Sequence, residues 1–487
     1  MSSSSRYVSS ILLYRFLHTA KRTFPADRIA SVGIASAASS VPLRLACGII
    51  QLTIMTKFWA HCGIVLLIAL LLRLGAVLAV RPWSEQYARL YLIHDPQVYH
   101  DLAVIFQKDG ITEDFRNTVA IYAPGYPILL GIVYKLFGVN LMPPVILNVL
   151  LSVITCVVLM VTTRKIFGER TAIVAGLLFA LHPHSIRFST ILYSETLFML
   201  IASIFVLGLL YTQLLDKKWG WGVAVAALAA SLGAFSRISM LYFSVLAVLC
   251  WIISNKPSWR LALRQFSLFA IIYLILLSPW MIHNKLHHGT FRLSVSGEYN
   301  LLALVVGSAK ADDIDTFHVL KNELLRTAYE RARQDGVNNI FEVSGYFLDV
   351  AIEEISKDPS KFLLSQIKGM YNFWFRPVQA KSSRVSELLQ NDPKIAYYIY
   401  YSYVFQAILF LAWIALFFDK GRIPTPWKVL SVVAVIYFAF TIGNAAYSRF
   451  FLHALPYILP IAAVNLVSFY DWVRKSTLNR ADQIISR

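Results

Sequence analysis

Two acidic side chains stand at positions where a carboxylate could do chemistry. Glu195 lies near one end of a long apolar stretch. A charged side chain at membrane depth costs about 3 kcal/mol on insertion scales, so it tends to mark a cavity or a partner. The alternative is a carboxylate that snorkels to the membrane surface. Asp95 follows His94 and precedes Pro96, and it could be a general base, a turn former or a helix cap.

Three arginines have the chemistry to bind a phosphate. Arg187, Arg237 and Arg449 are the only basic residues in three short turns between apolar segments. A guanidinium binds phosphate oxygens bidentately and keeps its charge when partly desolvated. Pairing with Glu195 or with other acids inside a helix bundle would explain the same arginines. Arg73 lies inside an apolar segment, where we expect it to snorkel or to pair structurally.

Histidine and cysteine spacing gives no sign of a metal or cofactor site. His184 and His283 could line a cavity, but no HExxH-type spacing surrounds them, and lone histidines are usually just hydrogen-bonded. The sequence also has no GxxxxGK[ST] loop for a nucleotide, so we expect neither a metal nor a cofactor. The cysteines lie within or beside apolar segments without a CxxC pair, and we expect inert packing residues. They are Cys47, Cys62, Cys156 and Cys250.

The elements that position these residues must be membrane-spanning helices. Of 487 residues, 57% are apolar and 15% are charged, against about 25% charged in soluble proteins. Apolar runs such as 64–80 and 145–161 approach the roughly 20 residues that cross a bilayer as a helix. They lack the alternation of barrel strands, so the sequence predicts an all-α polytopic membrane protein.

The basic residues set the expected topology. We expect about ten spans: 61–80, 141–163, 170–182, 189–211, 219–234, 239–254, 262–281, 398–418, 427–442 and 453–470. With the start of the first span in the cytoplasm, the cytoplasmic turns are basic. The two large loops on the other side are charge-balanced: 81–140 holds five basic and six acidic residues, and 282–397 holds fourteen of each. This is the positive-inside pattern, which explains the net charge of +18 better than nucleic-acid binding does.

The chain therefore divides into four expected parts. Residues 1–54 are Ser-rich, with six basic residues and one acid, which is typical of an extension or targeting segment. Met55 is an alternative start, and a further helix near 41–56 is an alternative reading. Residues 55–281 form an N-terminal transmembrane module with the loop 81–140. Residues 282–397 form the second external region, with helical patterns such as 352–370. Residues 398–487 hold the last helices and a cytoplasmic tail.

Several motifs, in order along residues 60–470, resemble the C-type glycosyltransferase superfamily. The branch they resemble holds the protein O-mannosyltransferases and the lipid A aminoarabinose transferase. His94-Asp95-Pro96-Gln97-Val98-Tyr99 is similar to the family's Asp-x-x-x-Tyr segment in the first external loop. Pro124-Gly125-Tyr126-Pro127 is similar to a Pro-Gly-Tyr-Pro piece that forms a short surface helix.

Four later motifs continue the resemblance. Residues 182–198, with Glu195, and 233–237, which end in Arg237, resemble the family's third to fifth spans. Pro279-Trp280-Met281-Ile282-His283-Asn284 resembles a Pro-Trp-x-x-Arg-Asn motif in which His283 replaces arginine, which weakens a phosphate role there. Ser448-Arg449-Phe450 resembles the Arg-Tyr segment before the last span.

The resemblance implies an inverting transfer of a hexose or pentose from a polyprenyl-phosphate carrier to an acceptor. The acceptor would be a glycolipid, a polysaccharide or a protein, and the site would face the external side, as in the periplasm of a bacterium with the enzyme in its inner membrane. Asp95 and Glu195 would be catalytic. Arg187, Arg237 and Arg449 would bind the donor phosphate, and the remaining candidates would line the cavity: Tyr99, Tyr126, His184 and His283.

Two other functions fit a protein of this kind. A transporter or flippase for lipid-linked sugars would typically have internal repeats and Gly- or Pro-broken helices in matching halves, and neither is clear in this sequence. A polysaccharide polymerase or ligase would also have many spans and a large external loop, but it would use a diphosphate-linked oligosaccharide.

Overall fold

The computed structural model describes residues 41–215, 220–311, 314–376 and 393–485. These residues form helices and no strand, which confirms the all-α fold class. The chain divides into two units, Met1–His61 and Cys62–Arg487. Helix α2, Val41–Val80, contains the further helix considered near 41–56. Residues 1–40 and the basic pair Lys217 and Lys218 lie outside the described residues.

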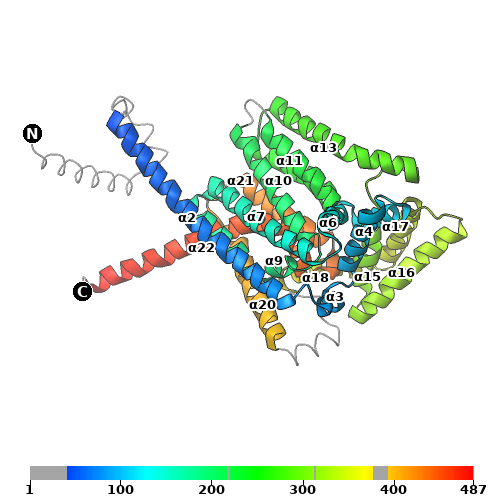
Figure 1. The fold of residues 1–487 in the computed structure, drawn as a ribbon. Coiled ribbons are helices and arrows are strands. Elements are labelled where there is room, and N and C mark those ends of the chain that lie inside the picture. The colour runs from blue at the N-terminus through cyan, green and yellow to red at the C-terminus, as the bar shows by residue number, and fades with distance from the viewer. Residues whose placement is uncertain (1–40, 216–219, 312–313, 377–392, 486–487) are drawn as a thin grey trace, which may run out of the picture. The chain divides into compact units, whose positions relative to one another are not determined.

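Each of the ten expected spans coincides with a helix (Figure 1). These helices are α2, α7 (Met142–Phe167), α8 (Glu169–Leu181), α10 (Glu195–Leu215), α11 (Trp221–Ser236), α12 (Ser239–Asn255), α13 (Trp259–His288), α20 (Pro393–Ile414), α21 (Thr425–Phe440) and α22 (Ser448–Ile485). Within the described part of the chain, 6 helices are long and apolar enough to cross a membrane: α2, α7, α10, α13, α20 with its 3-10 extension, and α22. The protein is therefore an integral membrane protein, and the number of ten spans stays a prediction.

Glycine allows the tight turn between α7 and α8. Gly168 has a φ of 87°, a conformation that side chains with a Cβ rarely adopt. Its N–H donates to the carbonyl of Arg164 and closes α7, and the next residue already begins α8. Arg164 also pairs with Glu169 across this turn at 2.7 Å. The two helices are consequently joined by one short connection.

The expected loop 81–140 folds into four short helices. They are α3 (Glu85–Tyr91), α4 (Asp95–Asp109), α5 (Glu113–Tyr122) and α6 (Gly125–Phe137). Ser84 and Thr112 begin two of them, because each side-chain oxygen accepts a hydrogen bond from a backbone N–H of the first turn. The short helix expected after Pro124 is α6.

The second expected loop region is also helical. It contains the end of α13, then α14 (Ser296–Asn300), a π-helical turn η2 (Leu301–Val306), α15 (Gly307–Lys310), α16 (Ile314–Gln334), α17 (Ile340–Lys357) and α18 (Pro359–Phe375). The helical pattern expected over 352–370 is present, and it is divided between α17 and α18. It is broken at Asp358, whose carboxylate accepts the N–H of Lys361, and Pro359 begins the next helix.

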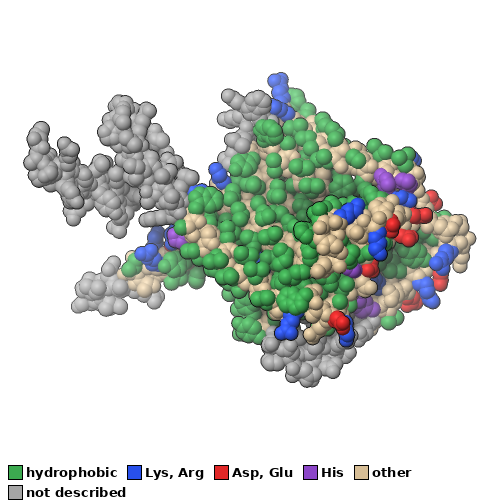
Figure 2. Space-filling view, viewed as in Figure 1, with side chains coloured by type: hydrophobic (Ala, Val, Ile, Leu, Met, Phe, Trp, Pro, Cys, Tyr) green, Lys and Arg blue, Asp and Glu red, His purple; other side chains and the backbone are tan. Residues whose placement is uncertain are grey.

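Charged side chains are concentrated at one end of the second unit. In Figure 2 the acidic, basic and histidine side chains gather where Figure 1 draws α4, α15, α16 and α17, while the bundle surface in view is largely hydrophobic. Toward the C-terminus of α22, Asp471 pairs with Arg170 of α8 at 3.3 Å. That pair marks the region of the basic turns, which the sequence places in the cytoplasm.

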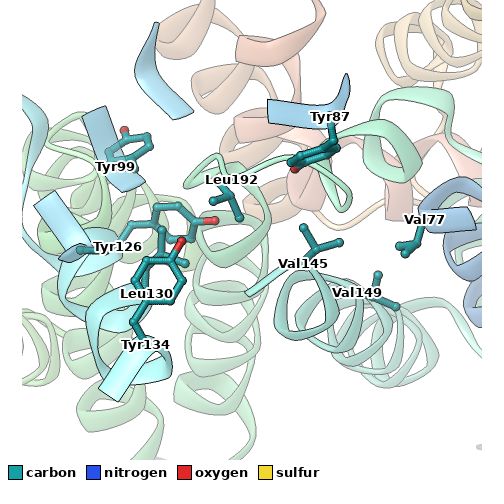
Figure 3. Close-up of a cluster of buried hydrophobic side chains, with 10 residues drawn as sticks. Val77, Tyr87, Tyr99, Tyr126, Leu130, Tyr134, Val145, Val149 and Leu192 are labelled. Atoms are coloured by element: carbon teal, nitrogen blue, oxygen red, sulfur yellow. The ribbon is translucent and has the colours of Figure 1, made fainter. Parts of the chain in front are cut away.

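Two buried groups hold the helices beneath the first loop together. Tyr87, Tyr99, Tyr126 and Tyr134 pack with Val145 and other apolar residues in one cluster (Figure 3). Below this cluster, the side chain of Arg73 is 0% exposed, so the snorkelling alternative for it is wrong.

Arg73 is instead held by neutral partners. Its guanidinium donates to the hydroxyls of Ser152 at 2.7 Å and Ser185 at 3.0 Å, and to backbone carbonyls of α2 and α8. These bonds tie α2 and α7 to α8 and to the short helix α9 (Pro183–Phe188). Cys62, Cys156 and Cys250 are free, with the first two buried and the third partly buried.

Candidate functional site

Asp95 is positioned by the start of α4. It is the first residue of the helix, Pro96 follows it, and His94 before it has a φ of 56°. This positive φ is uncommon for a residue with a Cβ, and it turns the chain sharply into the helix. Tyr99 lies one turn later on the same helix and is buried. Its hydroxyl lies 3.4 Å from the hydroxyl of Ser194. The first loop is thus connected to the start of α10.

Glu195 is the first residue of α10 and is fully buried. The snorkelling alternative for this carboxylate is therefore wrong. Arg237, the C-terminal capping residue of α11, donates to one Glu195 oxygen at 2.6 Å and to the hydroxyl of Ser194 at 3.2 Å. Arg449, near the start of α22, also donates through Nε to Glu195. A buried charge costs several kcal/mol unless it is paired, and here two cations share it.

Arg449 connects the two acids. Its Nη1 lies 2.7 Å from a carboxylate oxygen of Asp95, while its Nε contacts Glu195. The guanidinium also lies over the ring of Tyr193, with 4.2 Å from Cζ to the ring centre. We call Asp95, Glu195, Arg237 and Arg449 the acid–arginine cluster. It joins the ends of α4, α10, α11 and α22, which are far apart in the sequence.

The cluster keeps the Asp95 carboxylate ionised. Burial alone would raise the pKa of Asp95, but the neighbouring Arg449, with smaller contributions from Arg237 and Lys321, brings that pKa below its ordinary value of 3.8. At neutral pH Asp95 is an anion that can accept a hydrogen bond. A carboxylate with a lowered pKa is a weak base, so it can orient a hydroxyl and accept its proton late in a reaction.

A cavity of about 310 Å³ opens beside the cluster. Its lining includes Asp95 and Tyr122 from the first loop region, Tyr299 and Lys321 from the second, and Arg449 from α22. Both large loop regions therefore meet at one cavity, which supports their placement on the same side of the membrane. Polar and aromatic side chains share the lining, as is common where a protein binds a ligand with hydroxyl groups and an apolar face.

The structure brings only some of the sequence-predicted residues together. Asp95, Tyr99, Arg237 and Arg449 line the cavity. Glu195 does not face it as expected and lies behind the arginines, with one carboxylate oxygen that has no hydrogen bond.

Four other candidates lie outside the cavity lining. Tyr126 packs edge to face on Tyr99, with 5.2 Å between ring centres. His184 bonds to Tyr398 at 2.7 Å, and Arg187 lies over the Tyr398 ring. His283 stacks on Trp280 and lies tilted against His287, both on its own helix.

Sequence reasoning missed the residues that the second loop contributes. Ser296, Tyr299, Asn300, His318 and Lys321 all line the cavity. In the sequence, their segment looks like an ordinary polar loop. One signal could have indicated that α16 contributes to the site, namely an amphipathic pattern with a lysine on its apolar face. The described residues contain no group of His, Cys, Asp and Glu side chains that could hold a metal ion.

One family model matches part of the chain. Residues 122–283, about a third of the chain, match the family described as dolichyl-phosphate-mannose-protein mannosyltransferase. This match confirms the resemblance to the C-type glycosyltransferase superfamily. No curated protein matches the sequence.

Solved structures of similar fold have low identity to this chain. The crystal structure of ArnT from Cupriavidus metallidurans bound to undecaprenyl phosphate has a TM-score of 0.45 and 14% identity, and the match covers 85% of this chain and 60% of that one. The apo oligosaccharyltransferase of Archaeoglobus fulgidus has a TM-score of 0.47 and 14% identity, with 88% and 52% covered. The chain thus spans little more than half the length of these proteins.

Proposed function

We propose that this protein is a membrane glycosyltransferase that takes a sugar from a polyprenyl-phosphate carrier. The acid–arginine cluster beside a cavity at one end of an apolar bundle carries this proposal. A carboxylate and several cations around one cavity provide the groups that transfer from a phosphate leaving group requires. The match to the mannosyltransferase family over residues 122–283 points the same way.

In the proposed reaction an acceptor hydroxyl displaces the phosphate from the sugar. The acceptor oxygen forms a bond to the anomeric carbon as the bond from that carbon to the phosphate oxygen breaks. The electron pair of the broken bond stays on the phosphate, and the hydroxyl proton moves to Asp95. A single displacement of this kind inverts the configuration at the anomeric carbon.

The cations of the cluster would act on the leaving group. Arg237 and Arg449 are fixed by their bonds to Glu195, so they need little reorganisation when negative charge develops on the phosphate. Glu195 would serve as the buried anchor that holds both guanidinium groups at the cavity. In this role Glu195 would not contact the sugar directly, because it is fully buried.

The membrane side of the site follows from the basic turns. The sequence places the loops 81–140 and 282–397 opposite those turns, and residues of both loops line the cavity. We therefore propose an external site, periplasmic if the host is a bacterium and the membrane its inner one. The donor lipid would reach the site from the bilayer, and a glycolipid, a polysaccharide or a protein would be the acceptor.

Transfer of labelled sugar tests the proposal directly. The purified full chain would be incubated with a series of labelled polyprenyl-phosphate sugars and with membrane extract that contains acceptors. Label that moves to an acceptor without added nucleotide would support the transferase. If label only crosses the bilayer of proteoliposomes and stays on the carrier, the protein is a transporter. If transfer requires a diphosphate-linked oligosaccharide, the protein is a polymerase or ligase.

A further inference from the structure

Lys321 is a cation of the cavity that no described acid balances. It lies on α16, in the second loop region, and lines the same cavity as Asp95, Arg237 and Arg449. Arg237 and Arg449 bond to Glu195, and Arg449 also pairs with Asp95. Lys321 forms no such ion pair with any residue that the structure describes.

The position of Lys321 on its helix directs it inward. Phe317 and Leu324 are 5% and 7% exposed, and Lys321 lies four residues after the first and three residues before the second. Side chains at these spacings share one face of a helix, so Lys321 stands on the buried face of α16. A lysine on an apolar face is costly unless its charge meets a partner.

Among the side chains that the structure describes, the charges around the cavity leave one positive charge in excess. Three cations, Arg237, Arg449 and Lys321, stand against two acids, Asp95 and Glu195. A partly enclosed cavity screens charge less than bulk water does, so the excess attracts an anion. Burial raises the pKa of the Asp95 carboxyl, and the nearby cations lower it. Lys321 contributes to this lowering after the two arginines, so its charge already acts on Asp95.

Two imidazoles stand with Lys321 in the cavity lining. The rings of His94 and His318 are nearly parallel, with centres 6.3 Å apart, and both residues line the cavity. One belongs to the first loop and the other to α16. A neutral imidazole carries one N–H that can donate a hydrogen bond to an oxyanion. The two loop regions thus bring an ammonium and two imidazole rings to the lining of one cavity.

We propose that Lys321 binds the phosphate of the lipid-linked donor. This proposal rests on the proposed transferase function and adds Lys321 to Arg237 and Arg449 as a residue that holds the phosphate. A phosphodiester between a polyprenol and a sugar carries one negative charge, which balances the excess of the cavity. The ammonium group offers three N–H donors and a compact charge, whereas the arginines already share theirs with Glu195 and Asp95.

Binding of undecaprenyl phosphate to the full chain in detergent tests the assignment. Lys321→Met keeps a long side chain and removes the charge, and it should weaken binding about 10- to 100-fold, which is about 1.4 to 2.7 kcal/mol. Lys321→Arg should restore most of the affinity. The matched control is Arg326→Gln on the same helix, since Arg326 is 70% exposed and pairs only with Glu330 of its own helix. This control should bind within about twofold of wild type, because exposed charges are screened.

The outcomes separate this inference from the proposed function. Wild-type affinity in Lys321→Met, with sugar transfer still lost in Asp95→Asn, would overturn the role of Lys321 and leave the transferase intact. An equal loss in Lys321→Met and Arg326→Gln would also overturn it, because a general change of charge would then explain the effect. A wild-type protein that binds no polyprenyl phosphate and transfers no sugar would refute the function itself. Melting temperatures measured on each variant exclude misfolding as the cause.

Discussion

Asp95→Asn should abolish sugar transfer and leave the fold and donor binding largely unchanged. Asparagine keeps the shape of the side chain and one of its oxygens. That oxygen can still accept the hydrogen bond from Nη1 of Arg449, which lies 2.7 Å from the Asp95 carboxylate in the wild-type protein. Arg449 also keeps its contact with Glu195, so the loss of stability should be about 1 kcal/mol. The lost proton acceptor should lower the rate about 10²- to 10⁴-fold. Transfer of labelled sugar and the melting temperature would be measured on the same preparation.

Asp101→Asn is the matched control on the same helix. Asp101 is exposed and does not line the cavity, because six residues turn a helix by about 240°. This variant should keep wild-type activity. If Asp101→Asn is inactive and Asp95→Asn is active, the assignment of the motif is wrong. If neither change matters, the transferase mechanism loses its proton acceptor and the transporter alternative gains support.

Three further results are expected. Arg237→Leu or Arg449→Leu should weaken donor-lipid binding by about 1.5 to 3 kcal/mol, as for loss of a charge-assisted hydrogen bond, and unchanged affinity in both would mean that they only neutralise acids. Cysteines introduced into loops 81–140 and 282–397 should react with an impermeant reagent from the same, non-cytoplasmic side; labelling of either from the cytoplasm would refute the topology. Asp95 should cause no decrease in the transfer rate between about pH 7 and pH 5, because its lowered pKa keeps the carboxylate ionised until well below that range. A decrease in rate near pH 6 that disappears in a variant of Asp95 would contradict this.

The transmembrane helices could be predicted from the sequence, and the break in the second loop could not. Long apolar runs indicate segments that lie in lipid, because such a segment requires both an apolar surface and internal backbone hydrogen bonds. The segment 352–370 has a helical pattern on both sides of Asp358, and its break depends on a capping carboxylate and a proline. Arg73 was ambiguous for a similar reason, since its serine and carbonyl partners come from segments far along the chain.

The site was predictable where a charge lies in an apolar context. Glu195, Arg237 and Arg449 stand out because charges are rare there, and their pairing with one another was one of the two alternatives that the sequence left open. Lys321 could not be found this way, because lysines are common in polar loops and only the packing of α16 shows that this one faces inward. Arg187 met the same sequence criterion as the other arginines, and its contact with Tyr398 takes it away from the cluster.

The sharing of Glu195 between two arginines has a consequence for how the protein is made. Glu195 and Arg237 belong to α10 and α11, whereas Arg449 belongs to α22, more than two hundred residues later in the chain. During synthesis the earlier helices enter the membrane with Asp95 and Glu195 facing one arginine. The second guanidinium arrives only with the last helix. A chain released before α22 would leave Asp95 without its arginine and Glu195 with one arginine instead of two. The charge network is therefore completed only when the last helix is added, and its ion pairs distinguish chains that contain α22 from chains that lack it.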